Sequence, residues 1–327
     1  ELAKSSIKKT DRLNDETFEG VELSVDLGPK QNSLEHDSRD LIELRTFPGC
    51  AQYLSTEDLK KLDLIDYFSD WEKSSLPWDE FTKNIAENKK NIIISAVNIH
   101  NAGGSIVQEL SFICGLLNCL VESKLLKISS VLYIEVALDS LYFNNIAKLR
   151  SLRYLLEFLG EQIDLPPFEI ICVNSLREQT LYDPWCNMLR GSIGTTAAFN
   201  GGANKINCLS YDHLGHLNSD YKHSSLGLRQ AENSFYILNE ESFLGAVKDP
   251  AAGSVIIEEL TQKFIELSFQ KFKQLEKNGG LFECITKLSF EVESIAKLRE
   301  DNIINQKKII PGVNSFTNTQ ESLQELY

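Results

Sequence analysis

Four short runs of apolar residues, each followed by a long amphipathic stretch, organise the middle of the chain. The runs cover residues 92–97, 131–136, 168–173 and 206–209. After them, apolar residues recur at helical spacing over residues 105–124, 143–160, 185–200 and 224–243. Apolar runs of strand length that alternate with helices are typical of parallel βα units, whose strands are buried on both faces. The pattern therefore predicts four consecutive βα units between residues 91 and 245.

The segments on either side have different patterns. The spacing of apolar residues in 246–327 predicts only helices, over 254–278 and 281–299. We expect this segment to pack on the βα units. Residues 1–90 form an N-terminal arm and a shortened front of the fold. Within it, alternation predicts a strand over 21–27, and two short helices are predicted around 59–68 and 78–86.

Two α/β architectures fit four such units: a doubly wound sheet and a (β/α)8 TIM barrel. No Gly-x-Gly-x-x-Gly segment follows any of the four predicted strands, which disfavours a nucleotide-binding sheet. Residues 1–90 leave room for only about two further units of ordinary length. If the fold is a barrel, we expect it to be incomplete or irregular at its N-terminal side.

Composition narrows the classes of function. The 327 residues carry a net charge of −14, which disfavours a nucleic-acid-binding protein, because phosphate contact needs clustered Lys and Arg. No apolar run reaches the ~18 residues of a membrane span, and Glu1 to Ser6 lack the apolar core of a signal peptide. The seven cysteines form no Cys-x-x-Cys pair. We expect a cytoplasmic protein with reduced thiols and no membrane contact.

The longest distinctive segment covers residues 181–190 and reads Leu-Tyr-Asp-Pro-Trp-Cys-Asn-Met-Leu-Arg. Asp183 before Pro184 predicts the start of a helix, which would end at the glycine pair 201–202. Further distinctive segments are His100 with Ala-Gly-Gly and Gln-Glu-Leu after it, residues 144–153, 229–233, 240–242, 249–254 and 310–316. In this order the segments resemble the methylmalonyl-CoA mutase family from about residue 94 to the C-terminus. Tyr-Asp-Pro, Asn-Met-Leu-Arg and Glu-Glu-Ser are most similar to the small subunit of the heterodimeric bacterial enzymes.

The resemblance implies an activity and a partner. Enzymes of this family interconvert methylmalonyl-CoA and succinyl-CoA by radical chemistry on adenosylcobalamin. Their catalytic chains have a (β/α)8 barrel that threads the CoA arm, and a separate cobalamin domain. The resemblance therefore implies a heterodimer in which this chain pairs with a large catalytic subunit.

The cobalamin ligand of the family is the His of an Asp-x-His-x-x-Gly segment. The chain has five histidines, and the residues two positions before them are Leu34, Asn98, Tyr211, Leu214 and Tyr221. None is Asp, so we expect adenosylcobalamin to be bound by the partner subunit and not by this chain. The cluster of His213, His216 and His223 has no fixed metal-ligand spacing, and we expect no metal there.

The resemblance also places the family's substrate-binding residues. Its carbonyl-facing His falls on Asn207, its Gln on Val173, and its Arg near Glu169 or Ile170. Asn can still donate a hydrogen bond, but neither Glu nor Ile can hold a carboxylate as Arg does. These degenerate positions predict that the isolated chain has no catalytic residues.

The remaining candidates for contact with a substrate are His100, Asn174 and Asn207. For His100 two interpretations stay open, because a strand-end His can face the active site of a barrel or can be buried and satisfied by backbone groups. Three functions also stay open: a small subunit of a mutase, a stand-alone barrel protein that binds an acyl-CoA, and a scaffold partner of a cobalamin enzyme.

Overall fold

The computed structural model describes residues 42, 44, 48, 51–84, 91–126, 131–163, 165–217 and 224–317. The predicted strand over 21–27 lies outside these residues, as do Cys50 and His223. Within the described helices, none combines the length and the apolar character that crossing a bilayer requires.

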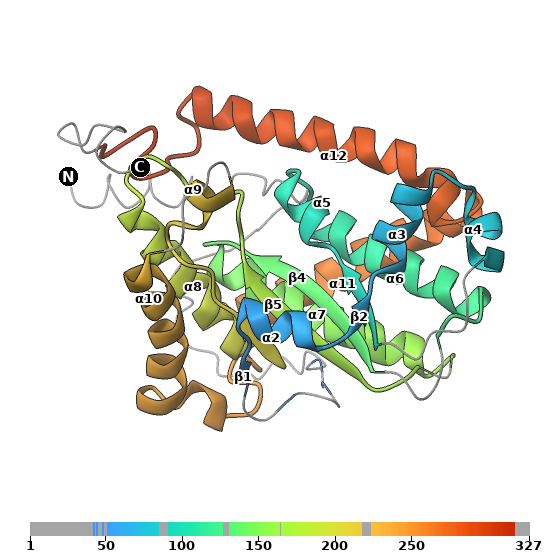
Figure 1. Ribbon diagram of the computed structural model, residues 1–327, viewed down its shortest axis with the longest axis horizontal. Coiled ribbons are helices and arrows are strands. Elements are labelled where there is room, and N and C mark those ends of the chain that lie inside the picture. Colours follow the sequence, from blue (N-terminus) through green and yellow to red (C-terminus); the bar gives the residue numbers. More distant parts are fainter. Residues whose placement is uncertain are drawn as a thin grey trace, which may run out of the picture.

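One sheet of six parallel strands forms the centre of the molecule (Figure 1). Its order is β1–β6–β5–β4–β3–β2. The strands are β1 (Gln52–Tyr53), β2 (Leu64–Ile65), β3 (Asn91–Ser95), β4 (Leu132–Leu138), β5 (Phe168–Asn174) and β6 (Lys205–Asn207). The sheet curls into part of a barrel, which confirms the predicted α/β class and its incomplete (β/α)8 arrangement.

Helices follow the four longer strands, as the sequence predicts. They are α5 (Val97–Asn101) and α6 (Ile106–Glu122) after β3, α7 (Tyr142–Gly160) after β4, α8 (Trp185–Gly201) after β5, and α9 (His213–Leu217) and α10 (Ser225–Tyr236) after β6. The helix predicted to reach residue 243 leaves the α form earlier, because a π-helical turn follows over Ile237–Glu241.

The two faces of the sheet pack against different partners. Ile94, Ile134 and Ile170 belong to the main core with residues of α6 and α7. Neighbouring strand residues point the other way, because side chains alternate along a strand. On that concave face, Ile93, Tyr133 and Ile171 form a separate cluster.

The segment from β1 to β2 covers the concave face. β1 lies at one edge of the sheet and β2 at the other, so the ten residues between them cross from edge to edge. This crossing segment contains α2 (Thr56–Lys61), which lies in front of the strands in Figure 1. Its Leu54, Leu59 and Leu62 pack against the cluster of Ile93, Tyr133 and Ile171.

The prediction of a single helix around residues 59–68 is wrong. The structure has α2, then β2, then α3 (Tyr67–Ser74). Asp63 has a positive φ of 48°, which interrupts a helix. Asp66 then begins α3, because its carboxylate accepts hydrogen bonds from the backbone N–H groups of Phe68 and Ser69 at 3.1 and 3.2 Å. The second predicted short helix corresponds to α4 (Trp78–Asn84), while Ala86 lies outside the described residues.

Two long helices complete the fold. α11 (Val255–Lys277) packs against α6 and α7 on the convex side of the sheet, and α12 (Leu281–Ile304) runs along the edge of the molecule at the top of Figure 1. Arg299 of α12 donates a hydrogen bond to the carbonyl of Gly103 at 3.0 Å, which ties α12 to the turn after α5. The predicted boundaries at residues 90 and 245 stay predictions.

Candidate functional site

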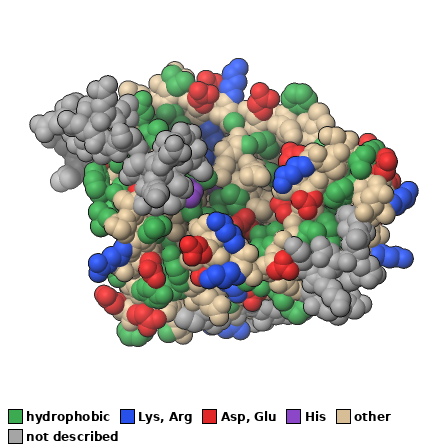
Figure 2. All heavy atoms as spheres, viewed as in Figure 1, with side chains coloured by type: hydrophobic (Ala, Val, Ile, Leu, Met, Phe, Trp, Pro, Cys, Tyr) green, Lys and Arg blue, Asp and Glu red, His purple; other side chains and the backbone are tan. Residues whose placement is uncertain are grey.

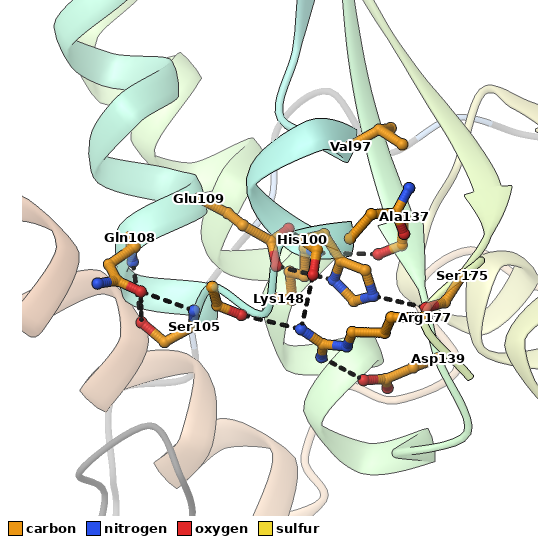
Figure 3. A network of polar contacts seen from close by, with 12 residues as sticks. Val97, His100, Ser105, Gln108, Glu109, Ala137, Asp139, Lys148, Ser175 and Arg177 are labelled. Carbon is orange, nitrogen blue, oxygen red and sulfur yellow. Dashed lines mark hydrogen bonds and ion pairs between the residues drawn. The ribbon is translucent and has the colours of Figure 1, made fainter. Parts of the chain in front are cut away.

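The candidate site lies at the carboxyl ends of β3, β4 and β5, where enzymes with parallel barrels place their active sites (Figure 3). His100 is near its centre. The side chain is carried by α5, the short helix that follows β3, and is only 2% exposed.

Both ring nitrogens of His100 have side-chain partners. Nδ1 lies 2.9 Å from Oε1 of Glu109, and Nε2 lies 2.8 Å from Oγ of Ser175. Burial lowers the pKa of His100 and outweighs the opposing effect of Glu109. The neutral ring therefore donates from Nδ1 to the carboxylate, and Nε2 accepts the hydroxyl proton of Ser175.

Glu109 is held in its charged form by a second partner. Burial raises the pKa of this carboxyl, but the attraction of Lys148 and the hydrogen bond from His100 outweigh it, so the pKa is lowered. Lys148, from α7, forms an ion pair with Oε2 of Glu109 and donates to the carbonyl of Ala137 at 2.9 Å. Neither charged side chain is exposed, and the pair joins α6 to α7 beneath His100.

Arg177 closes the other side of the network. It donates to the carbonyls of His100 and Gly104 at 3.0 and 2.9 Å, and to Oδ2 of Asp139 at 2.8 Å. Burial raises the pKa of Asp139, but Arg177 outweighs that effect and the pKa is lowered. The guanidinium thus joins the turn after α5 to the end of β4.

Ser175, His100 and Glu109 stand in the order of an activated nucleophile, a base and an orienting carboxylate. Two features oppose such a role. Ser175 is 5% exposed, and Glu109 is shared with Lys148. The arrangement is suited to holding a neutral imidazole in one orientation within a buried network.

Sequence reasoning missed most of this network. It singled out His100 and expected backbone partners if the ring were buried, whereas the partners are side chains. Gln108-Glu109-Leu110 and the segment with Lys148 were used only as family-like motifs. Their position after consecutive strands was the available signal, since such residues meet at one edge of a parallel sheet.

Asn174, the last residue of β5, has a structural role. Its Nδ2 donates to the carbonyl of Gly191 at 3.0 Å, and its Oδ1 accepts from the backbone N–H of Leu209 at 2.9 Å. These bonds attach α8 and the loop after β6 to the end of β5.

Asn207 ends β6 and lies directly opposite Val173 of β5. It is 4% exposed, and its Oδ1 is buried with no hydrogen-bond partner among the described residues. The structure therefore brings together the two positions to which the resemblance assigns the family's His and Gln.

The two candidate positions for the family's Arg are separated. Ile170 packs in the main core beside the helices. Glu169 precedes it on the opposite face and forms an ion pair with Lys205 of β6. Of the two, only Glu169 is on the concave face.

Neither His100 nor a cluster of side chains in the described part of the chain is arranged to hold a metal ion. His100 has no free ring nitrogen to offer, because Glu109 and Ser175 occupy both. Across the described ranges, no three His, Cys, Asp or Glu side chains are grouped to hold a metal ion. We therefore assign no step of a cobalamin reaction to these residues.

Comparisons with known proteins place the chain in a family. The family model described as methylmalonyl-CoA mutase matches residues 73–327. The chain is 31% identical over 241 residues to the probable methylmalonyl-CoA mutase small subunit of Mycobacterium tuberculosis (strain ATCC 25618 / H37Rv), covering 70% of this chain and 39% of that protein. It is 30% identical over 257 residues to the methylmalonyl-CoA mutase small subunit of Propionibacterium freudenreichii subsp. shermanii, covering 73% and 39%. With the small subunit of Porphyromonas gingivalis (strain ATCC BAA-308 / W83) it shares 28% identity over 266 residues, covering 77% and 42%.

The chain thus spans about two fifths of the length of the curated relatives it matches. The matched region includes the segments around Asp183 and Asp249 and the whole His100 network. On the extent of the family match and the identity to these relatives, the chain belongs to the methylmalonyl-CoA mutase family.

Proposed function

We propose that this chain acts as the small subunit of an adenosylcobalamin-dependent methylmalonyl-CoA mutase. In this proposal it pairs with a large subunit in the cytoplasm. The large subunit binds the cofactor and carries out the exchange of methylmalonyl-CoA and succinyl-CoA. This chain contributes assembly and support, and does not turn over substrate alone.

The observation that carries the proposal is the pairing of Val173 with Asn207 across β5 and β6. Catalytic chains of the family are expected to present Gln and His at these positions toward a thioester. Val173 offers no polar atom, and Asn207 cannot act as an acid or a base. Leaving a polar group of the substrate unpaired in a closed site costs about 1–3 kcal/mol of binding free energy.

The crossing segment supports the same proposal. A catalytic barrel of the family threads the CoA arm through its interior. Here Leu54, Leu59 and Leu62 pack on the concave face, over Ile93 and Tyr133. Apolar side chains thus occupy the side of the sheet that would face such an interior.

His100 gives a third support. It keeps the family's place at a strand end, but its nitrogens are engaged by Glu109 and Ser175 in a buried network. Contact with a substrate would require one of these two hydrogen bonds to break.

The experiment is co-expression of the full chain with a large mutase subunit. We expect size exclusion with light scattering to show a stable 1:1 complex, and a succinyl-CoA assay with adenosylcobalamin to show turnover by the complex but not by this chain alone. Turnover by the chain alone would overturn the proposal. A chain that stays monomeric beside the large subunit, but is stabilised by a CoA ester in a thermal shift assay, would instead support a stand-alone acyl-CoA-binding barrel.

A further inference from the structure

A groove between α3, the turn after it and α12 lies at the end of the molecule away from the His100 network. Its cavity volume is about 560 Å³, within the range of about 300–1,000 Å³ that ligand-binding clefts occupy. One wall is formed by Phe68, Trp71 and Glu72 of α3, and the other by one face of α12, from Ile285 to Glu293. We name this feature the α3–α12 groove.

Aromatic packing holds the apolar side chains of the α3 wall in place. Trp71 meets the ring of Phe282 edge-on at 4.5 Å, and Phe68 meets Phe112 edge-on at 4.9 Å. The indole N–H of Trp71 donates to the carbonyl of Leu76 at 2.7 Å, which fixes the ring against the turn. The groove is therefore preformed, and a ligand would not have to order these side chains.

The exposed part of the groove carries an uncovered aromatic ring. Phe290, on the α12 wall, is 64% exposed. Leu76 and Pro77 line the groove from the opposite side. Large apolar side chains gathered at an open cleft are typical of a surface that binds another molecule.

Both charged side chains that line the groove are acidic. Glu72 and Glu293 line its two walls, and neither has a basic side chain within 4.0 Å among the described residues. Outside the lining, the two helices carry charges of both signs: Asp70 and Lys73 lie on α3, and Asp79, Glu80 and Lys83 lie on α4. Acidic and basic side chains likewise both occur on the face of the molecule in Figure 2. At the lining, charge complementarity therefore favours a basic occupant.

We propose that the α3–α12 groove binds a basic amphipathic helix of a partner protein. Two helices form the walls, and a third helix laid between them would bury apolar residues on Phe68, Trp71 and Phe290. Its Lys or Arg side chains would reach Glu72 and Glu293 at the rim. The proposal does not depend on the mutase assignment, because it concerns a surface away from the His100 network.

The test uses the full chain and a fluorescent peptide of leucine and lysine, with leucines at helical spacing. A matched peptide with glutamate in place of lysine controls for the apolar part. We expect the lysine peptide to bind, the glutamate peptide to bind at least about tenfold more weakly, and added salt to weaken binding of the lysine peptide. Failure of the lysine peptide to bind would overturn the proposal.

Matched variants separate groove binding from general attraction to an acidic protein. Glu72→Gln with Glu293→Gln removes two charges from the groove, whereas Glu57→Gln with Glu232→Gln removes two exposed charges elsewhere. We expect only the first pair to weaken binding, by about tenfold. Phe290→Ala should weaken it similarly, and Phe316→Ala, at an 82% exposed ring outside the groove, should not.

Circular dichroism and thermal unfolding establish that each variant is folded. If both glutamate pairs weaken binding equally, the peptide follows net charge and the groove proposal is wrong. Unchanged binding by folded Phe290→Ala would refute it independently.

Discussion

Lys148 and Glu109 form an ion pair in which neither side chain is exposed to solvent. The two residues come from neighbouring helices, α7 and α6, and Glu109 also orients His100. The two buried charges compensate each other. Replacing one of the two residues should therefore destabilise the protein more than replacing both together.

Lys148→Met should destabilise the protein by about 3–5 kcal/mol, because it leaves the carboxylate of Glu109 buried without its main counter-charge. Urea unfolding followed by circular dichroism measures this change. The double variant with Glu109→Gln should recover part of the stability, since the unpaired charge is gone. As a control, Lys61→Met removes the exposed ion-pair partner of Asp58 and should change the urea midpoint of unfolding little. A single variant as stable as wild type would show that the pair is not essential to the packing of α6 on α7.

The stability of the fold should depend on the protonation of His100. Its pKa in the folded protein lies below the ordinary value of 6.5, so the unfolded chain takes up the proton first as the pH falls. The stability that the neutral ring contributes is therefore present above about pH 6.5. It is lost as the pH falls from there toward the pKa of His100 in the folded protein. His100→Gln should remove this part of the pH dependence.

Urea midpoints between about pH 5 and pH 8 measure that difference. The comparison must be between wild type and variant, because burial raises the pKa of Glu135 and Glu178, and these groups change stability in the opposite direction. Identical pH profiles for wild type and His100→Gln would contradict the prediction.

The regular part of the fold could be predicted from sequence because local periodicity determines it. β3, β4 and β5 are largely buried strands with apolar runs, β6 contains the buried Ile206, and helices begin after all four as expected. The edge strands could not be found in this way. β1 and β2 have two residues each, and their pairing with β6 and β3 depends on contacts far along the chain.

The candidate site was predicted only in part for a related reason. Lys148, Arg150 and Arg153 lie on α7, and basic residues on a helix normally indicate a solvated face. All three are buried, on different sides of the helix. Lys148 pairs with Glu109 of α6, and Arg150 pairs with Asp249 and with Glu258 of α11. Arg153 donates to the carbonyl of Gly202, which follows α8. Helical periodicity gave no indication that another helix would cover these charges.

Gly103 should not tolerate a side chain. Its φ is 101°, and an added Cβ would lie 2.5 Å from Cβ of Ala296 on α12. Gly103→Ala should therefore separate α12 from the turn after α5 and weaken the hydrogen bond from Arg299. Gly253→Ala is the matched control, because φ there is 81° but nothing lies within 4 Å of the added Cβ.

Both alanine variants carry the cost of a left-handed backbone, of about 1–2 kcal/mol. Only Gly103→Ala adds the steric clash, so thermal unfolding should show a larger decrease in stability for it, and amide hydrogen exchange should be faster in α12. Equal decreases in the two variants would mean that α12 adjusts to the added methyl group without cost.

The apolar cover on the concave face gives the last prediction. Leu54, 4% exposed, packs in the cluster with Ile93, Tyr133 and Ile171, and Leu59 and Leu62 of the crossing segment adjoin it. Leu54→Ala should destabilise the fold by about 2–5 kcal/mol, because the segment cannot collapse fully into the space left behind. Leu226→Ala, at a 55% exposed position on α10, should change stability by less than about 0.5 kcal/mol. The decisive measurement is amide hydrogen exchange of residues 54–65, which should become faster in Leu54→Ala and stay unchanged in Leu226→Ala. If exchange in this segment is already fast in the wild-type protein, the segment leaves the concave face readily. The interior of the partial barrel would then be open to ligands, and the argument that the crossing segment keeps a CoA arm out would fail, while the pairing of Val173 with Asn207 would still stand against turnover.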